Sequence, residues 1–445
     1  MLLIHVPRLT NRLGYTLNVL FHYILKTDFE ITVDATIYDA FDGPKLCYGP
    51  RMPKDGIFLR SSDLLFRTTV EEVDPHCFIF KDIKALFPVH NQASALPFDI
   101  LASAFWCLSR YEEYLPHFTD QHGRFPASAS LAYRERFLSS AIVDRWALLL
   151  ADVVRQKYPD VRFAQRFFDY EDTIDIDAAY CYKHKGLSRT LVGMGRDLLT
   201  VDRKSLLTKR LRTLIGKEND PFDNFDYIIG LHERHPGLRL KFFPLMADYN
   251  VYDKPIGYLN SEFRALLQHL CDYAKMGLHS SYASQTNTAL VAVEAQRLSS
   301  LLHRKITRNR NHFLLLSLPK TYNTLIDNGI LHDYTMGYAD EPGFRAGTCT
   351  PFPFFDLESD CETRLTIHPF AAMDSTFYYY KKVQADAARQ VYKQLIDEAS
   401  QVGSVLSLLW HNQSFCDDFG WQGWRDLYEF VLDYSFNLKK ANRKP

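Results

Sequence analysis

The stretch Asp-Thr-Ile-Asp-Ile-Asp at residues 172–177 opens a long series of strand and helix signals. Apolar Ile174 and Ile176 precede and separate the carboxylates of Asp175 and Asp177. On a strand, residues two apart point to the same face, so these carboxylates would lie side by side. Such a pair repels itself unless a cation or a proton lies between the groups. The stretch therefore predicts a strand that ends in a metal ligand beside a general base. Loop aspartates that cap the next helix are the structural alternative.

Strands and helices alternate from about residue 165 onward. The predicted strands are 172–177, 238–246, 276–279, a short run near 305–316, 332–338, 363–368 and 404–410. The predicted helices are a run capped by Ser261 that reaches Ala274, 286–302, a run from Pro319 to Gly329, and a helix capped by Asp374 that reaches about Ser400. Seven strands with intervening helices predict a parallel (β/α) barrel of about seven units over residues 166–445. An open doubly wound sheet is the alternative.

The first 165 residues have a different rhythm. The strand candidates there are short and are separated by Gly and Pro, at 2–6, 29–34, 45–49 and 56–60. Two helices follow, at 99–115 and 142–158. This order predicts a smaller α+β domain over residues 1–165. Its residues indicate no chemistry beyond substrate recognition or packing.

Composition narrows the functional classes. The chain has 445 residues, of which 47% are apolar and 24% are charged, as in folded globular proteins. A formal net charge of -1 offers no overall electrostatic attraction to nucleic acid. The 26 Tyr and 32 Phe suit either a large core or a groove that faces a sugar.

Cysteine usage and the N-terminal residues bear on location. The eight cysteines are scattered and form no Cys-x-x-Cys pair, which predicts buried free thiols in a reducing compartment. The first residues lack the features of a signal peptide, and no apolar run reaches the length of a membrane span. We therefore expect a cytoplasmic protein. The sequence does not indicate its oligomeric state.

A basic segment interrupts the predicted barrel at residues 183–217. Its acids are Asp197 and Asp202, and leucines lie between its charges. Its ten cations are Lys183, Lys185, Arg189, Arg196, Arg203, Lys204, Lys209, Arg210, Arg212 and Lys217. A basic amphipathic helix can lie on an anionic membrane surface or hold an anionic ligand. Peripheral contact with the inner membrane is thus one expectation, and a solvated helix packed on the barrel is the other.

Reactive groups of barrel enzymes gather where the strands end. His279 stands at the end of the third predicted strand, after Gly277. With the two aspartates, it makes a divalent-ion site plausible, because Asp and His donors suit zinc or a similar ion. A second histidine is needed for an Asp-His-His set, and His312 is the candidate. A buried or arginine-paired structural histidine is the alternative for His312.

Two later residues complete the candidate set. Arg345 stands between Gly343 and Gly347, so a tight loop could aim its guanidinium at a carboxylate. His411 follows the apolar run 405–410 and emerges at a strand end, where an imidazole can donate a proton near pH 7. The structural alternative is a histidine packed among neighbouring tryptophans.

These residues, in this order, resemble the motifs of the polysaccharide deacetylases of carbohydrate esterase family 4, over about residues 165–435. The family has a TFDD-type motif, H-S/T-x-x-H, R-x-P-x-G and a late L-x-H. Thr173 to Asp177 resembles the first, His279-Ser280 the start of the second, Arg345 to Gly347 the third without its proline, and Leu409 to His411 the last. The chain also resembles bacterial deacetylase-like proteins with an uncharacterised N-terminal domain, through SRYEEYL at 109–115, 333–348 and LLWHN at 408–412.

The resemblance implies a distorted barrel and a metal-dependent hydrolase that removes an acyl group, most often N-acetyl, from a sugar or glycan. Asp177, His279 and His312 would hold a divalent ion, with zinc the expected metal. That ion would polarise the acyl carbonyl and activate a water molecule. Asp175 would accept a proton from this water.

The same resemblance assigns the remaining roles. Arg345 would orient Asp175 and keep it ionised, and His411 would protonate the leaving amine. Trp410, Tyr338 and Phe344 are the aromatic residues expected to line the sugar groove.

The chain also departs from the family motifs. Ala283 stands where the second histidine of H-S/T-x-x-H belongs, and Ile176 is inserted between the two acids. A second interpretation is therefore a catalytically degenerate barrel that binds a glycan or a lipid-linked glycan. A third is a glycoside hydrolase that uses Asp175 and another carboxylate, although no second acid has a comparable context.

Overall fold

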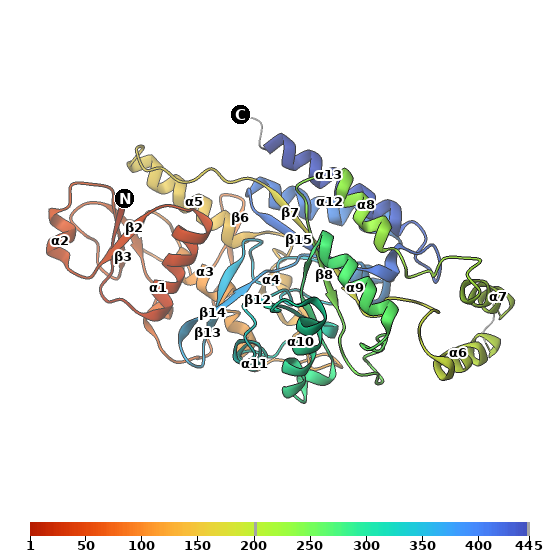
Figure 1. Ribbon diagram of the computed structural model, residues 1–445. Coiled ribbons are helices and arrows are strands. Elements are labelled where there is room, and N and C mark those ends of the chain that lie inside the picture. Colours follow the sequence, from red (N-terminus) through yellow and green to blue (C-terminus); the bar gives the residue numbers. More distant parts are fainter. Residues whose placement is uncertain (200–202, 443–445) are drawn as a thin grey trace.

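The computed structural model describes residues 1–199 and 203–442 (Figure 1). Asp202, one of the two acids counted in the basic segment, lies outside the described residues. Short parallel sheets with helices around them make up the chain, so its class is mixed α/β.

The N-terminal sheet has the strand order β2-β1-β3-β4. Its strands are β1 (Leu2–His5), β2 (Phe29–Thr32), β3 (Lys45–Gly49) and β4 (Ile57–Arg60), all at the predicted positions. Each neighbouring pair is parallel. The α+β domain over residues 1–165 stays a prediction, although the strands of this sheet all run parallel. Strand signals locate strands but do not state their direction.

One of the two helices predicted for this region differs from expectation. The predicted helix 99–115 ends early, because Arg110 adopts a left-handed conformation with φ 53°. A 3-10 turn, η3 (Tyr111–Tyr114), follows it. The other elements are α1 (Asn11–Leu17), η1 (Asn18–Ile24), α2 (Ala35–Ala40), η2 (Leu64–Phe66), β5 (Phe78–Phe80), β6 (Ile83–Ala85), α3 (Ile100–Leu108), η4 (Ala127–Ala129), α4 (Leu131–Arg134) and α5 (Ile142–Lys157).

A second parallel sheet contains the Asp175 strand, in the order β15-β7-β8-β9. Its strands are β7 (Asp169–Ile176), β8 (Arg239–Pro244), β9 (Lys275–Met276) and β15 (Val405–His411). The register of β7 and β15 pairs Asp175 with His411. Residues 236 positions apart in the chain are thus brought side by side at one sheet edge, which the sequence pattern could not state.

A third sheet has the order β10-β11-β12-β14-β13. Its strands are β10 (Leu278–Ser280), β11 (Arg308–Asn311), β12 (His332–Asp333), β13 (Phe352–Asp356) and β14 (Cys361–Ile367). Strand β13 was not predicted and pairs antiparallel with β14. Isolated parallel bridges, Leu245–His279 and Met373–Leu409, link this part of the chain to the second sheet. These links are compatible with a closed ring, and the seven-unit barrel stays a prediction.

Helices follow most strands of this region. The helix expected to start at Ser261 is capped instead by the Asn260 side chain. The long helix expected from Asp374 is divided at Lys382, which has φ 53°. The elements are α8 (Phe225–Arg234), α9 (Ser261–Tyr273), η5 (Ala283–Gln285), α10 (Ala289–Leu302), η6 (His312–Leu314), α11 (Lys320–Asp327), η7 (Thr376–Lys381), α12 (Ala385–Gln401), η8 (Asn412–Phe415) and α13 (Trp424–Asn442).

The basic segment forms two helices, α6 (Leu187–Leu199) and α7 (Arg203–Leu214). They lie at the end of the molecule opposite the N-terminal sheet (Figure 1). Arg210 of α7 pairs with buried Asp197 of α6, and Lys209 pairs with Asp418 outside the segment. None of the helices in the described part of the chain is long and apolar enough to cross a membrane.

One hydrophobic core joins the N-terminal region to the third sheet. Tyr15 and Phe105 pack against Phe355 of β13, with ring centroids 4.9 and 5.2 Å away. The Tyr15 hydroxyl donates a hydrogen bond to the Pro353 carbonyl. The change of rhythm near residue 165 therefore marks a change in topology but not an edge of the core.

Candidate metal and catalytic site

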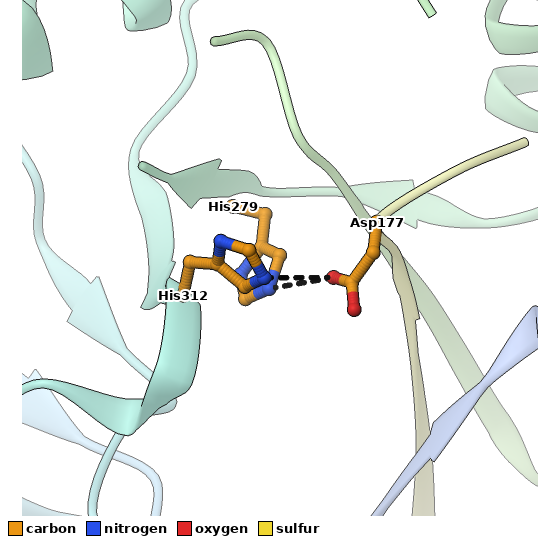
Figure 2. Close-up of side chains that lie close together, drawn as sticks. All are labelled: Asp177, His279 and His312. Atoms are coloured by element: carbon orange, nitrogen blue, oxygen red, sulfur yellow. Dashed lines mark ion pairs between the residues drawn. The ribbon is translucent and has the colours of Figure 1, made fainter. Parts of the chain in front are cut away.

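An aspartate and two histidines meet where three parallel strands end (Figure 2). Asp177 follows β7, His279 lies on β10, and His312 follows β11. One ligand atom from each residue lies within 4.8 Å of the others. The structure thus brings together the three residues predicted as metal ligands.

The Asp177 carboxylate shows that this group fits a cation. Its Oδ1 atom lies 3.2 Å from Nε2 of His279 and 3.6 Å from Nε2 of His312. Oδ1 is buried, and no group within the described residues forms a hydrogen bond with it. This oxygen therefore has ion-pair contacts with two histidines but accepts no hydrogen bond from the described residues, an arrangement that a bound cation would also satisfy. An Asp-His-His donor set suits zinc or a similar divalent ion.

Acceptors behind the two rings set their orientation. Nδ1 of His279 lies 2.9 Å from the Arg310 carbonyl, and Nδ1 of His312 lies 2.7 Å from Oδ1 of Asp253. Each Nδ1 therefore donates a proton outward, so Nε2 is the ring nitrogen that faces the cluster. Ala283 contributes its backbone N–H to Asp253. Ala283 thus supports, through its backbone, the carboxylate that orients His312.

Charges in the cluster shift two pKa values. Burial alone lowers the pKa of His312, but the Asp177 and Asp253 carboxylates outweigh it and raise that pKa to about 9. Burial alone raises the pKa of Asp177, but interactions with His312, His279 and His411 hold it well below its ordinary value. In the protein without a bound ion, positive charge on nearby histidines stabilises the Asp177 carboxylate. A bound cation would replace that positive charge.

Asp175 lies beside this group and is almost fully buried. Its Oδ1 accepts a hydrogen bond of 2.8 Å from Arg310, and its Oδ2 lies 3.5 Å from Nε2 of His279. Arg310 is itself fully buried and also donates to Thr173 and to the Tyr334 carbonyl. Arg310 therefore holds Asp175 in the way that was expected of Arg345.

The assignment of Arg345 is corrected by the structure. Its guanidinium donates to both carboxylate oxygens of Glu113, at 2.9 and 2.7 Å, and to the Gly337 carbonyl. Burial alone raises the pKa of Glu113, but Arg345 and Arg110 outweigh it and lower that pKa to about 2. A guanidinium was rightly expected to meet a carboxylate. The carboxylate is 232 residues upstream, in the SRYEEYL stretch, and no local signal names it.

His411 is held by the carboxylate of Asp374, which the sequence predicts to be a helix cap. Nδ1 of His411 lies 2.6 Å from Oδ1 of Asp374, and its backbone N–H donates to Oδ2 of the same residue. Its Nε2 lies 4.0 Å from Oδ2 of Asp177. Burial alone lowers the pKa of His411, but Asp374 outweighs it and raises that pKa to about 10. His411 thus presents Nε2 to the cluster, as a proton donor requires.

The three aromatic residues predicted for a sugar groove are in the core. Trp410 is 0%, Tyr338 2% and Phe344 1% exposed. Trp410 stacks on Tyr392 at 5.0 Å, and the Tyr338 hydroxyl accepts from Arg110. These assignments are corrected, because β15 is covered by α12 and α13 and its Trp410 side chain points into that layer rather than out of the strand end.

A cavity of about 1050 Å³ opens instead on Asp177 and His312. Its walls include residues that follow β7, the loop after β8, and helix α6. The aromatic side chains on its walls are Tyr182, Phe222, Tyr249, Tyr252, Phe313, Tyr378, Tyr379, Phe419 and Trp421. This cavity is the space in which a ligand would reach the Asp-His-His group.

Three supporting residues were missed by sequence analysis: Asp253, Arg310 and Asp374. Arg310 had a signal, because strand alternation in Arg308-Asn309-Arg310-Asn311-His312 points Arg310 away from its two asparagine neighbours. Asp374 follows the predicted strand 363–368 by a few residues, as Asp177 follows its strand. Asp253 lies in an irregular loop, and no pattern marks it.

Comparisons with known proteins match the N-terminal region to one family model and the chain to several solved structures. A family of unknown function, DUF7033, matches residues 2–159, the region whose role the sequence did not indicate. No curated protein matches the chain. Among solved structures, it is similar to a protein from Mycobacterium smegmatis described as a polysaccharide deacetylase. The two are 10% identical, with a TM-score of 0.39, and the match covers 63% of this chain and 91% of that chain.

Other solved structures are similar at the same level. A protein from Pseudomonas aeruginosa described as a polysaccharide deacetylase is 11% identical, with a TM-score of 0.37 and coverage of 61% and 85%. A polysaccharide deacetylase from Bacillus cereus is 12% identical, with a TM-score of 0.30 and coverage of 60% and 85%. A 4-alpha-glucanotransferase from Thermococcus litoralis also matches, with a TM-score of 0.34 and 11% identity, over 63% of this chain and 38% of that chain. Likenesses this distant do not distinguish activities, so the site residues alone carry the functional proposal.

Proposed function

We propose that this protein is a metal-dependent hydrolase that removes an N-acyl group, such as N-acetyl, from a sugar or glycan. One observation carries the proposal: the buried Oδ1 of Asp177, which accepts no hydrogen bond among the described residues, lies 3.2 and 3.6 Å from the Nε2 atoms of two histidines. An ion-paired carboxylate and a carboxylate-held histidine flank this group. That combination matches amide hydrolysis, which needs a Lewis acid, a base and an acid.

Asp177, His279 and His312 would hold the ion. When bound, a divalent ion supplies Lewis-acid chemistry to the acyl carbonyl and to the attacking water. Asp253 and the Arg310 carbonyl keep the two imidazoles in the tautomer that such binding requires. Both orienting contacts, to Asp253 and to the Arg310 carbonyl, are made by residues of this chain.

Asp175 acts as the base and His411 as the acid. Arg310 donates to Oδ1 of Asp175, so Oδ2 is left to accept the proton of the attacking water. Asp374 holds Nδ1 of His411, so the Nε2 proton goes to the leaving nitrogen. The water oxygen bonds to the acyl carbon, the C–N bond breaks, and the products are a carboxylate and an amino sugar.

Elemental analysis of the purified chain tests the proposal, with acetate release from N-acetylglucosamine oligomers as the second readout. We expect about one divalent ion per chain, lost in His279→Ala and in His312→Ala. His269→Ala is the matched control, because His269 is a half-exposed surface residue paired with Asp226, and it should keep the metal. Absence of metal in the wild type after supplementation would contradict the proposal. Saturable sugar binding without metal would then indicate the degenerate binding protein instead.

A further inference from the structure

The basic segment borders the cavity that leads to the Asp-His-His group. Ser188, Arg189, Val192, Gly193 and Arg196 of α6 line this cavity, together with Lys185 before the helix. Lys254 lines it from the loop after β8. Residues of the basic segment, for which the sequence left open a solvated helix or an anion-binding helix, therefore line the same cavity as Asp177 and His312.

Four of the lining cations have no carboxylate partner. Lys185, Arg189, Arg196 and Lys254 form no ion pair within the described residues. The other lining cation, Arg210, pairs with Asp197. A cation that lines a cavity without a counter-charge favours an anionic occupant.

Arg189 is held in place without being neutralised. Its guanidinium donates to the carbonyls of Pro255 and Lys254, at 2.8 and 3.3 Å, and lies 4.2 Å from the ring of Tyr249. Backbone carbonyls and an aromatic face orient a guanidinium but leave its full charge available. Lys185 is half-buried beside the same cavity. Together they resemble a prepared position for an oxyanion.

The lining carboxylates among the described residues are Asp177 and Asp197. Asp197 is balanced by Arg210, and Asp177 by the ion that the proposed function places there. The four unpaired cations thus exceed what a single carboxylate would neutralise, and a phosphate group carries up to two charges near pH 7. We propose that the cavity binds a phosphate ester of the N-acylated sugar, with Lys185 and Arg189 as its main contacts.

The sugar part of this inference rests on the proposed function. The phosphate part rests on the cations that line the cavity. The phosphate could belong to a soluble sugar phosphate or to a lipid-linked sugar. The experiment therefore also tests the lipid-linked source, because three leucines of α6 are exposed to solvent and could contact a lipid. The exposed fractions of Leu187, Leu191 and Leu199 are 86%, 65% and 85%. The recognised chemistry is the same in both cases.

Titration calorimetry on the full chain tests the inference with N-acetylglucosamine 1-phosphate and unmodified N-acetylglucosamine as probes. We expect the phosphorylated sugar to bind at least about tenfold more tightly, because charge-assisted contacts strengthen recognition. Lys185→Gln combined with Arg189→Gln should remove this advantage. Lys183→Gln is the matched control, a cation of the same segment outside the cavity lining, and it should keep the advantage. Equal affinity of the wild type for the two sugars would overturn the inference.

Two further readouts separate the outcomes. Sedimentation with phosphatidylglycerol vesicles tests the lipid source: vesicle binding lost in the double variant supports a lipid-linked phosphate. If the double variant still binds vesicles and no binding of the soluble sugar phosphate is seen, the phosphate does not bind in the cavity and the inference is overturned. Metal content separates the two proposals, since the double variant should keep its ion. If the chain holds no metal but still prefers the phosphorylated sugar, the hydrolase proposal is contradicted and the phosphate site is supported. If the chain holds metal but binds both sugars equally, the phosphate site is contradicted and the hydrolase proposal stands.

Discussion

Two buried carboxylate–guanidinium pairs, Asp175–Arg310 and Glu113–Arg345, differ in what surrounds them. Around Glu113, every carboxylate oxygen accepts a hydrogen bond from Arg110 or Arg345. Around Asp175, the neighbouring Asp177 keeps a buried oxygen that accepts no hydrogen bond from the described residues, and a cavity opens on Asp177. A saturated charge network stabilises a fold, whereas an unsaturated one next to a cavity is prepared for a ligand.

Substitution of Asp175 should have the largest effect on activity. In Asp175→Asn the amide oxygen can still accept from Arg310, but the side chain can no longer take a proton. We expect deacetylation to fall by about 10²–10⁴-fold, the usual contribution of a general base, with metal content unchanged. Acetate release together with elemental analysis checks this. Full activity in this variant would remove Asp175 from the mechanism.

Substitution of Glu113 should instead affect stability. Glu113→Gln leaves Arg345 and Arg110 buried without their shared charge, which costs about 3–5 kcal/mol when a buried pair is broken. Urea unfolding at pH 7 measures this, and acetate release per folded molecule should stay at the wild-type level. A variant that unfolds like the wild type but loses turnover would return Arg345 to the catalytic machinery.

The same carboxylate predicts a pH dependence of stability. The pKa of Glu113 is about 2 in the fold, against an ordinary value of 4.5, so its stabilisation is complete above about pH 4.5. It is lost as the pH falls through about 2, and the shift corresponds to about 3 kcal/mol. The unfolding free energies of wild type and Glu113→Gln should therefore converge as pH is lowered from 5. A constant difference across that range would show that folding does not lower the pKa of Glu113.

A smaller effect is expected behind the metal ligands. Asp253→Asn weakens the acceptor that orients His312, and such supporting carboxylates affect metal affinity by about 10–100-fold. Competition with a zinc-binding dye measures the affinity. Asn323→Ala is the control, because Asn323 bonds to Asp356 on the third sheet, away from the site. Unchanged affinity in Asp253→Asn would argue that His312 is not a ligand.

The smallest effect should come from Tyr338. Tyr338→Phe removes only the acceptor for one Arg110 N–H, at a cost of about 1 kcal/mol in unfolding free energy. Because Tyr338 is 2% exposed, the KM for a sugar oligomer should not change. A rise in KM with unchanged stability would restore Tyr338 to the substrate groove.

Local patterns in the chain located most of the strands and placed the metal-ligand candidates at or near strand ends. Strand β7 and the ends at Asp177, His279 and His411 follow from alternation and from the rule that parallel strands end at one edge. Those patterns are carried by residues within a few positions of one another. These patterns can therefore be recognised without knowing which strand lies beside them.

Tertiary structure alone chose the partners: Arg310 rather than Arg345 for Asp175, Asp374 for His411, and the core rather than a groove for Trp410. It also turned the N-terminal sheet parallel and set the basic helix α6 along the cavity. Each of these depends on register and packing between segments far apart in the chain. A local pattern determines which side chains leave a strand end, whereas only the assembled sheets determine what each side chain meets.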